Sequence, residues 1–82
     1  MSRKDKLTRR LLSRPSDMRP EELIALLALY GLRPTRTRGS HCTCSDGLRR
    51  LTVPLNVKEL KKAYIAEAIK LLGLETDRET QD

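Results

Sequence analysis

The segment between residues 32 and 55 constrains the fold most, because its pattern does not suit a long helix. Residues 40–45 read SHCTCS, an alternation that is typical of a strand with one buried face. Asp46-Gly47 follows at once and favours a tight hairpin. Residues 49–54 form a further strand candidate, and an earlier run alternates threonine with arginine. The segment therefore predicts a three-stranded antiparallel meander.

Two leucine-rich segments flank the meander with the period of amphipathic helices. The first begins at Pro20, which suits a first helical position, and ends at Gly31. The second is expected to begin at Asn56, which with Glu59 three residues later resembles a capping box, and to end at Gly73.

A third, shorter helix is expected near the N-terminus. Residues 3–13 carry a narrow leucine stripe on a basic background, and Pro15 breaks the pattern. We expect one domain, with a basic helix and turn over residues 1–17, a core over 18–73 and a mobile tail over 74–82. The order of elements predicts a small two-layer α+β fold with the helices on one face of the sheet.

The charge of the chain bears on its partners. The sequence has 17 Lys and Arg against 11 Asp and Glu, a formal net charge of +6. Such a balance favours polyanions, because each neutralised phosphate releases condensed counterions. No apolar run reaches the roughly 18 residues that a spanning helix needs, and no signal-peptide core is visible. We therefore expect a cytoplasmic protein that does not bind membranes, with its cysteines reduced.

His41 is the only histidine and the candidate for acid–base chemistry. It follows Gly39, where the backbone can approach a ligand closely, and Ser40, which supplies a hydroxyl. Strand alternation places His41 on the face opposite Cys42 and Cys44. We expect the cysteines to pack against the helices and the histidine to face outward, although a lone histidine is also compatible with a plain surface role.

Basic residues near the histidine are candidate phosphate contacts. Arginines occur in the first and third predicted strands, and three lysines recur at i, i+3 and i+4 of the last predicted helix, where a solvated face is the alternative. The candidates are Arg36, Arg38, Gly39, Ser40, Arg49, Arg50, Lys58, Lys61 and Lys62. Aromatic residues for base stacking are nearly absent, which, for a nucleic-acid partner, favours a loose sequence preference and binding to the phosphate backbone.

His41-Cys42-x-Cys44 must also be weighed as a zinc site. Structural zinc sites use four ligands, usually in pairs from separate segments, and the chain has no second pair. On a strand, the histidine and the cysteines would also point apart. We therefore expect no metal ligands and treat Cys42 and Cys44 as small packed residues.

Four short motifs occur in order over about residues 18–73, and the set is more specific than any one of them. They are Leu26-Leu27-x-x-Tyr30-Gly31-Leu32, Arg36-x-x-Gly39-Ser40-His41, Val53-Pro54-Leu55 and Lys58-Glu59-Leu60-Lys61-Lys62. This ordered set resembles the HicA family of toxin endoribonucleases. The resemblance implies a fold like a double-stranded-RNA-binding domain. It also implies metal-independent cleavage of mRNA without a cofactor, with His41 as the residue required for activity.

The resemblance also implies a partner, a HicB-type antitoxin that covers the active surface and sets the oligomeric state. The chain departs from the family pattern at Cys42-Thr43-Cys44, where an aromatic or bulky residue is usual, and at Asn56, where a histidine is usual. Two alternatives therefore stay open. One is an RNA-binding relative that cuts weakly or not at all, and the other is a protein-interaction subunit bound to an acidic antitoxin.

If His41 is the catalytic base or acid, the chemistry follows from the substrate. The 2′-oxygen of a ribose attacks its own phosphate, leaving a 2′,3′-cyclic phosphate and a 5′-hydroxyl end. Arg38, Ser40 and the Gly39 amide would then stabilise the extra negative charge at phosphorus.

Overall fold

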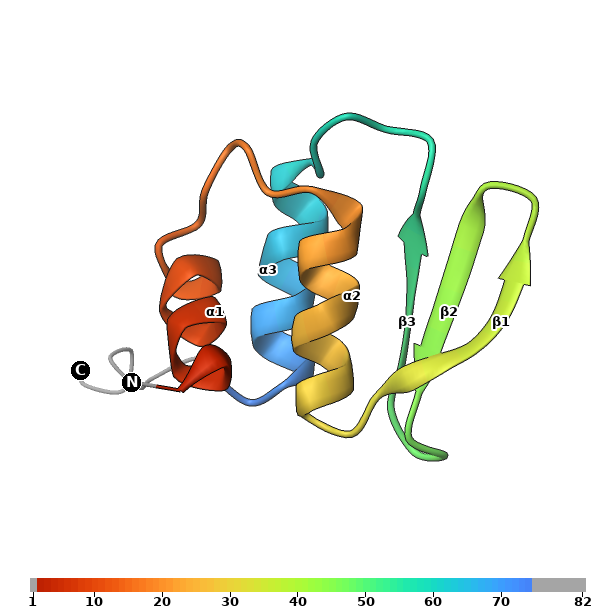
Figure 1. The fold of residues 1–82 in the computed structure, drawn as a ribbon, viewed down its shortest axis with the longest axis horizontal. Coiled ribbons are helices and arrows are strands. Elements are labelled where there is room, and N and C mark those ends of the chain that lie inside the picture. The colour runs from red at the N-terminus through yellow and green to blue at the C-terminus, as the bar shows by residue number, and fades with distance from the viewer. Residues whose placement is uncertain (1, 75–82) are drawn as a thin grey trace.

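The computed structural model describes residues 2–74 as three helices and one antiparallel sheet (Figure 1). The elements are α1 (Arg3–Leu12), α2 (Pro20–Leu29), β1 (Arg33–Arg38), β2 (His41–Ser45), β3 (Arg50–Pro54) and α3 (Lys62–Leu71). The strand order is β1-β2-β3, which confirms the α+β class and the meander. The tail expected over 74–82 lies, from residue 75 onward, outside the described residues.

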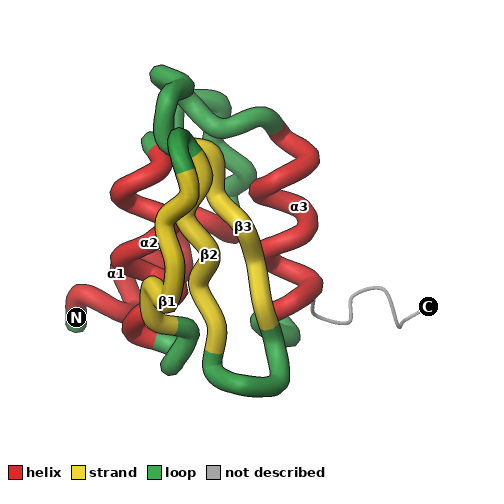
Figure 2. The backbone as a smooth tube through the Cα atoms, turned by 90° about the vertical axis from the view of Figure 1, so that its right-hand side faces the viewer, coloured by secondary structure: helices red, strands yellow, loops and turns green. Residues whose placement is uncertain are grey.

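All three helices lie on the same side of the sheet (Figures 1 and 2). α2 and α3 lie next to the strands, and α1 packs against both of them on the side away from the sheet. The helix α1 therefore adds a partial third tier to the expected two layers. Figure 2 shows that no described helix covers the opposite face of the sheet.

Glycine ends both α2 and α3, as the sequence predicts. Gly31 has a φ of 92°, and its N–H donates to the Ala28 carbonyl at 3.0 Å. The Leu32 N–H donates to the Leu27 carbonyl at 2.8 Å, which completes a Schellman motif and leaves Leu32 buried. The corresponding two bonds close α3 at Gly73.

The predicted start of α3 is wrong. The helix begins at Lys62 instead of Asn56, and residues 55–61 form an irregular segment. In a helix, the Leu60 N–H would donate to the carbonyl of Asn56. It donates instead to the Met18 carbonyl at 2.8 Å, and the side chains of Leu60 and Met18 are both buried. This contact with the segment before α2 replaces the helical path that the local capping signal favours.

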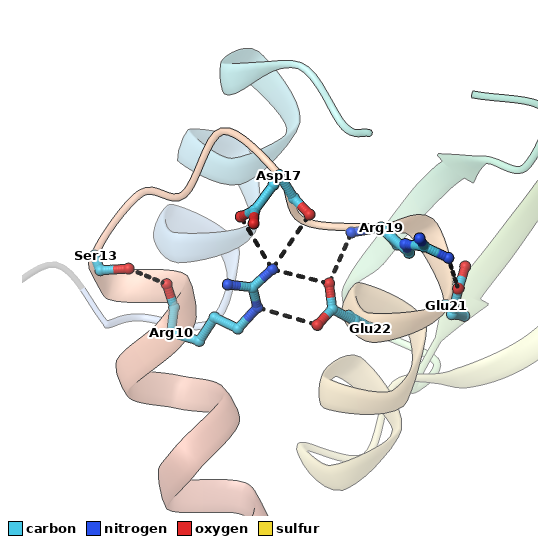
Figure 3. A network of polar contacts seen from close by, with 6 residues as sticks. All are labelled: Arg10, Ser13, Asp17, Arg19, Glu21 and Glu22. Atoms are coloured by element: carbon cyan, nitrogen blue, oxygen red, sulfur yellow. Dashed lines mark hydrogen bonds and ion pairs between the residues drawn. The ribbon is translucent and has the colours of Figure 1, made fainter. Parts of the chain in front are cut away.

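Arg10 joins α1 to the start of α2 (Figure 3). Its Nε and Nη2 donate to the two carboxylate oxygens of Glu22 at 3.0 and 3.1 Å, and Nη2 also lies 3.2 Å from the Asp17 carboxylate. Glu22 accepts the Arg19 N–H at 2.8 Å, in the manner of a capping-box glutamate. The hydrogen bond from Arg10 and then that from Arg19 hold the pKa of Glu22 below its usual value.

Replacing Arg10 with alanine should lower the free energy of unfolding by about 1–2 kcal/mol, because the half-buried Glu22 loses a two-pronged charged donor. Arg9→Ala is the matched control, since Arg9 is exposed on the same helix and its loss should change stability by less than about 0.5 kcal/mol. Urea unfolding followed by circular dichroism measures both variants. Equal losses would contradict the role of Arg10 in joining the helices.

Candidate nucleic-acid interface

His41 begins β2 directly after the two-residue turn Gly39-Ser40. Gly39 has a φ of 58°, in the left-handed region that glycine adopts readily. The Ser40 carbonyl accepts the Leu55 N–H at 2.6 Å, which ties the turn to the residue after β3. His41 therefore lies at the end of the sheet where β1 and β3 finish and β2 begins. We call this end of the sheet the corner.

The register of the sheet decides which residues lie beside His41. His41 has two cross-strand neighbours, which are Arg38 of β1 on one side and Pro54 of β3 on the other. Residues directly opposite each other in an antiparallel pair share a face, so Arg38 and His41 both lie on the face without helices. Both side chains are exposed. Arg36 lies opposite Thr43, further along the same face.

A β-bulge between Pro34 and Arg36 adds a third arginine to this face. Arg33 pairs with Ser45 and Arg36 pairs with Thr43, so Thr35 is the extra residue. Without the bulge, period-two alternation would place Arg33 and Arg36 on opposite faces. The sequence did not identify Arg33 as a candidate phosphate contact, because nothing in the local pattern predicts the bulge.

Cys42 and Cys44 point into the core, which confirms the predicted orientation of β2. Their exposed fractions are 5% and 0%. Burial, assisted by the neighbouring Cys42, raises the pKa of Cys44 to about 12. The thiols and the His41 imidazole lie on opposite faces and cannot converge on one ion. Over residues 2–74 no group of three or more His, Cys, Asp or Glu side chains is arranged to hold a metal.

The predicted hairpin is present, but residues 46–49 form the connection between β2 and β3, so the loop is longer than Asp46-Gly47 alone. The Asp46 carboxylate accepts the N–H groups of Arg49 and Leu48 at 2.7 and 2.9 Å. These backbone bonds, with a smaller contribution from the Arg49 guanidinium, lower the pKa of Asp46 to about 2. The turn is therefore held by the charged form of this side chain.

Two candidate arginines lie away from His41. Arg50 pairs with Ser45 at the far end of β2. Ser45 is four residues from His41, and at about 3.3 Å per residue the separation along the strand is roughly 13 Å. Arg49 lies in the hairpin turn, where its Nε donates to the Asp46 carboxylate at 2.9 Å and its Nη2 to the Tyr30 carbonyl at 3.3 Å. Arg49 therefore braces the hairpin against the end of α2, a structural role that the sequence did not reveal.

The three candidate lysines do not form a helical stripe, so the expected spacing on one helix is wrong. Lys58 lies in the irregular segment before α3, Lys61 is the N-cap of α3 and Lys62 is its first residue. Of these three, Lys61 lines a hollow beside His41.

The hollow has a volume of about 280 Å³. It is lined by His41, Pro54, Asn56, Val57, Glu59, Lys61 and Tyr64. Asn56, Glu59 and Tyr64 were absent from the candidates, because the sequence pattern assigned the first two to a helix cap and placed Tyr64 within the same predicted helix. Asn56 and Glu59 follow Pro54 closely in the sequence, and Pro54 lies opposite His41 in the meander. This closeness in sequence was the available signal that they lie near the histidine.

No family model, curated protein or solved structure matches the chain. Within the described residues no helix has the length and apolar character needed to cross a membrane. The function must therefore be inferred from the residues of the site itself.

Both cysteines should resist alkylation while the protein is folded, because burial blocks access and keeps the Cys44 thiolate scarce. Iodoacetamide at mildly alkaline pH should modify them only after urea unfolds the chain. Mass spectrometry of the adducts measures this. Modification of the native protein at the rate of the unfolded chain would contradict the inward orientation of the two thiols.

Proposed function

We propose that this protein is a metal-independent endoribonuclease that cuts mRNA, with His41 as the general base or acid. The pairing of Arg38 with His41 on a basic sheet face free of helices is the observation that carries the proposal. Attack of a ribose 2′-oxygen on a phosphodiester needs one group that moves a proton and another that stabilises negative charge. An imidazole beside a guanidinium meets both needs.

In the reaction, His41 removes the proton of a 2′-hydroxyl and the 2′-oxygen bonds to the adjacent phosphorus. The bond from phosphorus to the 5′-oxygen breaks, and that oxygen takes up a proton. The products are a 2′,3′-cyclic phosphate and a 5′-hydroxyl end. Arg38, the Ser40 hydroxyl and the Gly39 amide stabilise the charge that develops on the phosphoryl oxygens.

The row of arginines along β1 supports RNA as the substrate. Arg33, Arg36 and Arg38 share the exposed sheet face, and Arg50 lies beyond them across β2. Side chains of this kind contact phosphates and position a strand without reading its sequence. A single RNA strand that follows β1 would carry its backbone toward His41.

The resemblance to the HicA family extends the proposal to a toxin that acts in the cytoplasm. The order α2-β1-β2-β3-α3 agrees with the double-stranded-RNA-binding fold that the resemblance implies, and His41 lies at the start of the central strand. A HicB-type antitoxin is the proposed partner. An acidic surface on that antitoxin would match the arginines of the exposed sheet face and cover His41.

A second candidate is an RNA-binding protein of the same fold that does not cut. Asn56 stands where the family usually has a histidine, and it lines the hollow beside His41. The site therefore holds one imidazole where the family pattern suggests two. An acid for the leaving oxygen would then have to come from water or from His41 itself.

The purified protein should cleave a long mRNA in the presence of EDTA, and His41→Ala should lose at least about a hundredfold in rate. RNA binding should persist in His41→Ala, because the arginines remain. Gel analysis and end mapping measure rate and chemistry together. Products with 3′-hydroxyl ends, or a requirement for Mg²⁺, would contradict the role of His41. Binding without cleavage by the parent would favour the second candidate.

Arg38→Ala and Arg50→Ala remove the same charge from the same face at different distances from His41. Arg38→Ala should slow single-turnover cleavage at saturating RNA by about 10- to 100-fold, because it removes charge stabilisation at phosphorus. Arg50→Ala should weaken binding and reduce its salt dependence by about one unit of slope, with little change in that rate. Equal rate losses would argue against a special position for Arg38.

A further inference from the structure

The hollow beside His41 suits one flat ring with polar edges. Apart from His41, its lining residues belong to the stretch of chain from the end of β3 to the first turn of α3, whose path Figure 1 shows. Its apolar walls come from Pro54, Val57 and the half-buried Tyr64. A volume of about 280 Å³ is enough for a nucleobase, and a tyrosine ring is a surface on which a base can stack.

The polar residues of the lining include Glu59, Asn56 and Lys61, whose side chains end in a carboxylate, an amide and an ammonium. All three side chains are exposed, and neither Glu59 nor Lys61 makes an ion pair with another residue of the described chain. Leu60 lies between these two charged residues and is buried, with its N–H bonded to Met18. The buried Leu60 therefore anchors the segment that carries both charges at the rim of the hollow.

We propose that this hollow binds the base on the 5′ side of the scissile phosphate and that Glu59 selects guanine. The inference rests on the proposed nuclease, since it places the base next to the phosphate on which the 2′-oxygen, assisted by His41 and Arg38, makes its attack. A carboxylate accepts hydrogen bonds and donates none. Guanine offers it two adjacent donors, the N1–H and the exocyclic amino group. Adenine and cytosine offer one amino group each, and uracil offers a single imide N–H.

The other lining groups complete the fit. The Tyr64 ring stacks on the base, and Lys61 supplies a positive charge for the phosphate that follows it. Cleavage is then selective for guanine. The sequence led to the opposite expectation of a loose preference, because the chain has only two tyrosines and no other aromatic ring of the Phe or Trp type on which bases could stack.

Binding of the four nucleoside 3′-monophosphates to the full-length protein tests the site without any cleavage step. Calorimetry should show guanosine 3′-monophosphate binding about tenfold more tightly than the uridine compound, with the other two between them. Glu59→Gln should reduce the ratio of guanosine to uridine affinity to between about one and two. Glu67→Gln is the matched control, because Glu67 is exposed on α3 and does not line the hollow. This substitution removes the same charge as Glu59→Gln.

Tyr64→Leu should weaken the binding of all four nucleotides by about tenfold, whereas Tyr64→Phe keeps the ring and the affinity. The melting temperature of each variant reports on folding. If Tyr64→Leu does not fold, the Glu59→Gln ratio decides the test.

A guanosine-to-uridine ratio near one in the parent protein overturns the guanine site. The site is also overturned if Glu59→Gln slows cleavage of all RNAs equally while the binding ratio is unchanged, since Glu59 then acts in the chemistry. Guanine-selective binding without cleavage of any RNA would support this site and overturn the nuclease. Cleavage without base preference would support the nuclease and overturn this site.

Discussion

Cys42 and Cys44 fill the space between the central strand and the helices, and their burial sets the direction of every side chain on β2. Because side chains alternate along a strand, two inward thiols require His41 and Thr43 to face outward. A slip of one residue would expose both thiols and bury the imidazole. The same register places Arg38 opposite His41. The composition of the exposed sheet face is therefore a consequence of core packing.

The features that the sequence predicted correctly depend on signals within a few residues of one another. Gly31 and Gly73 end their helices because a left-handed residue is needed there, whatever surrounds it. The turn at Asp46-Gly47 forms because the nearby N–H groups of Leu48 and Arg49 donate to the Asp46 carboxylate. The outward orientation of His41 follows from the alternation of small and polar residues along its own strand.

The features that the sequence did not predict depend on contacts between distant segments. The capping signal at Asn56 is overridden because Leu60 bonds to Met18 and is buried beside it. In the sequence, Arg49 cannot be told apart from the arginine next to it. Its structural role depends on the Tyr30 carbonyl at the end of α2, to which its guanidinium donates a hydrogen bond. The irregular path before α3 also brings Tyr64 to the hollow. The candidate site was therefore predictable on β2 and not on the segment that faces it.

The hydrogen bond from the Leu55 N–H to the Ser40 carbonyl has a mechanical consequence. It links the turn that carries His41 to the first residue of the segment that forms the hollow. The same corner is also joined by the pairing of His41 with Pro54, so the segment and the turn are connected through backbone groups. The two parts of the corner are therefore coupled, and a substitution that displaces residues 55–61 will also displace the turn that precedes His41.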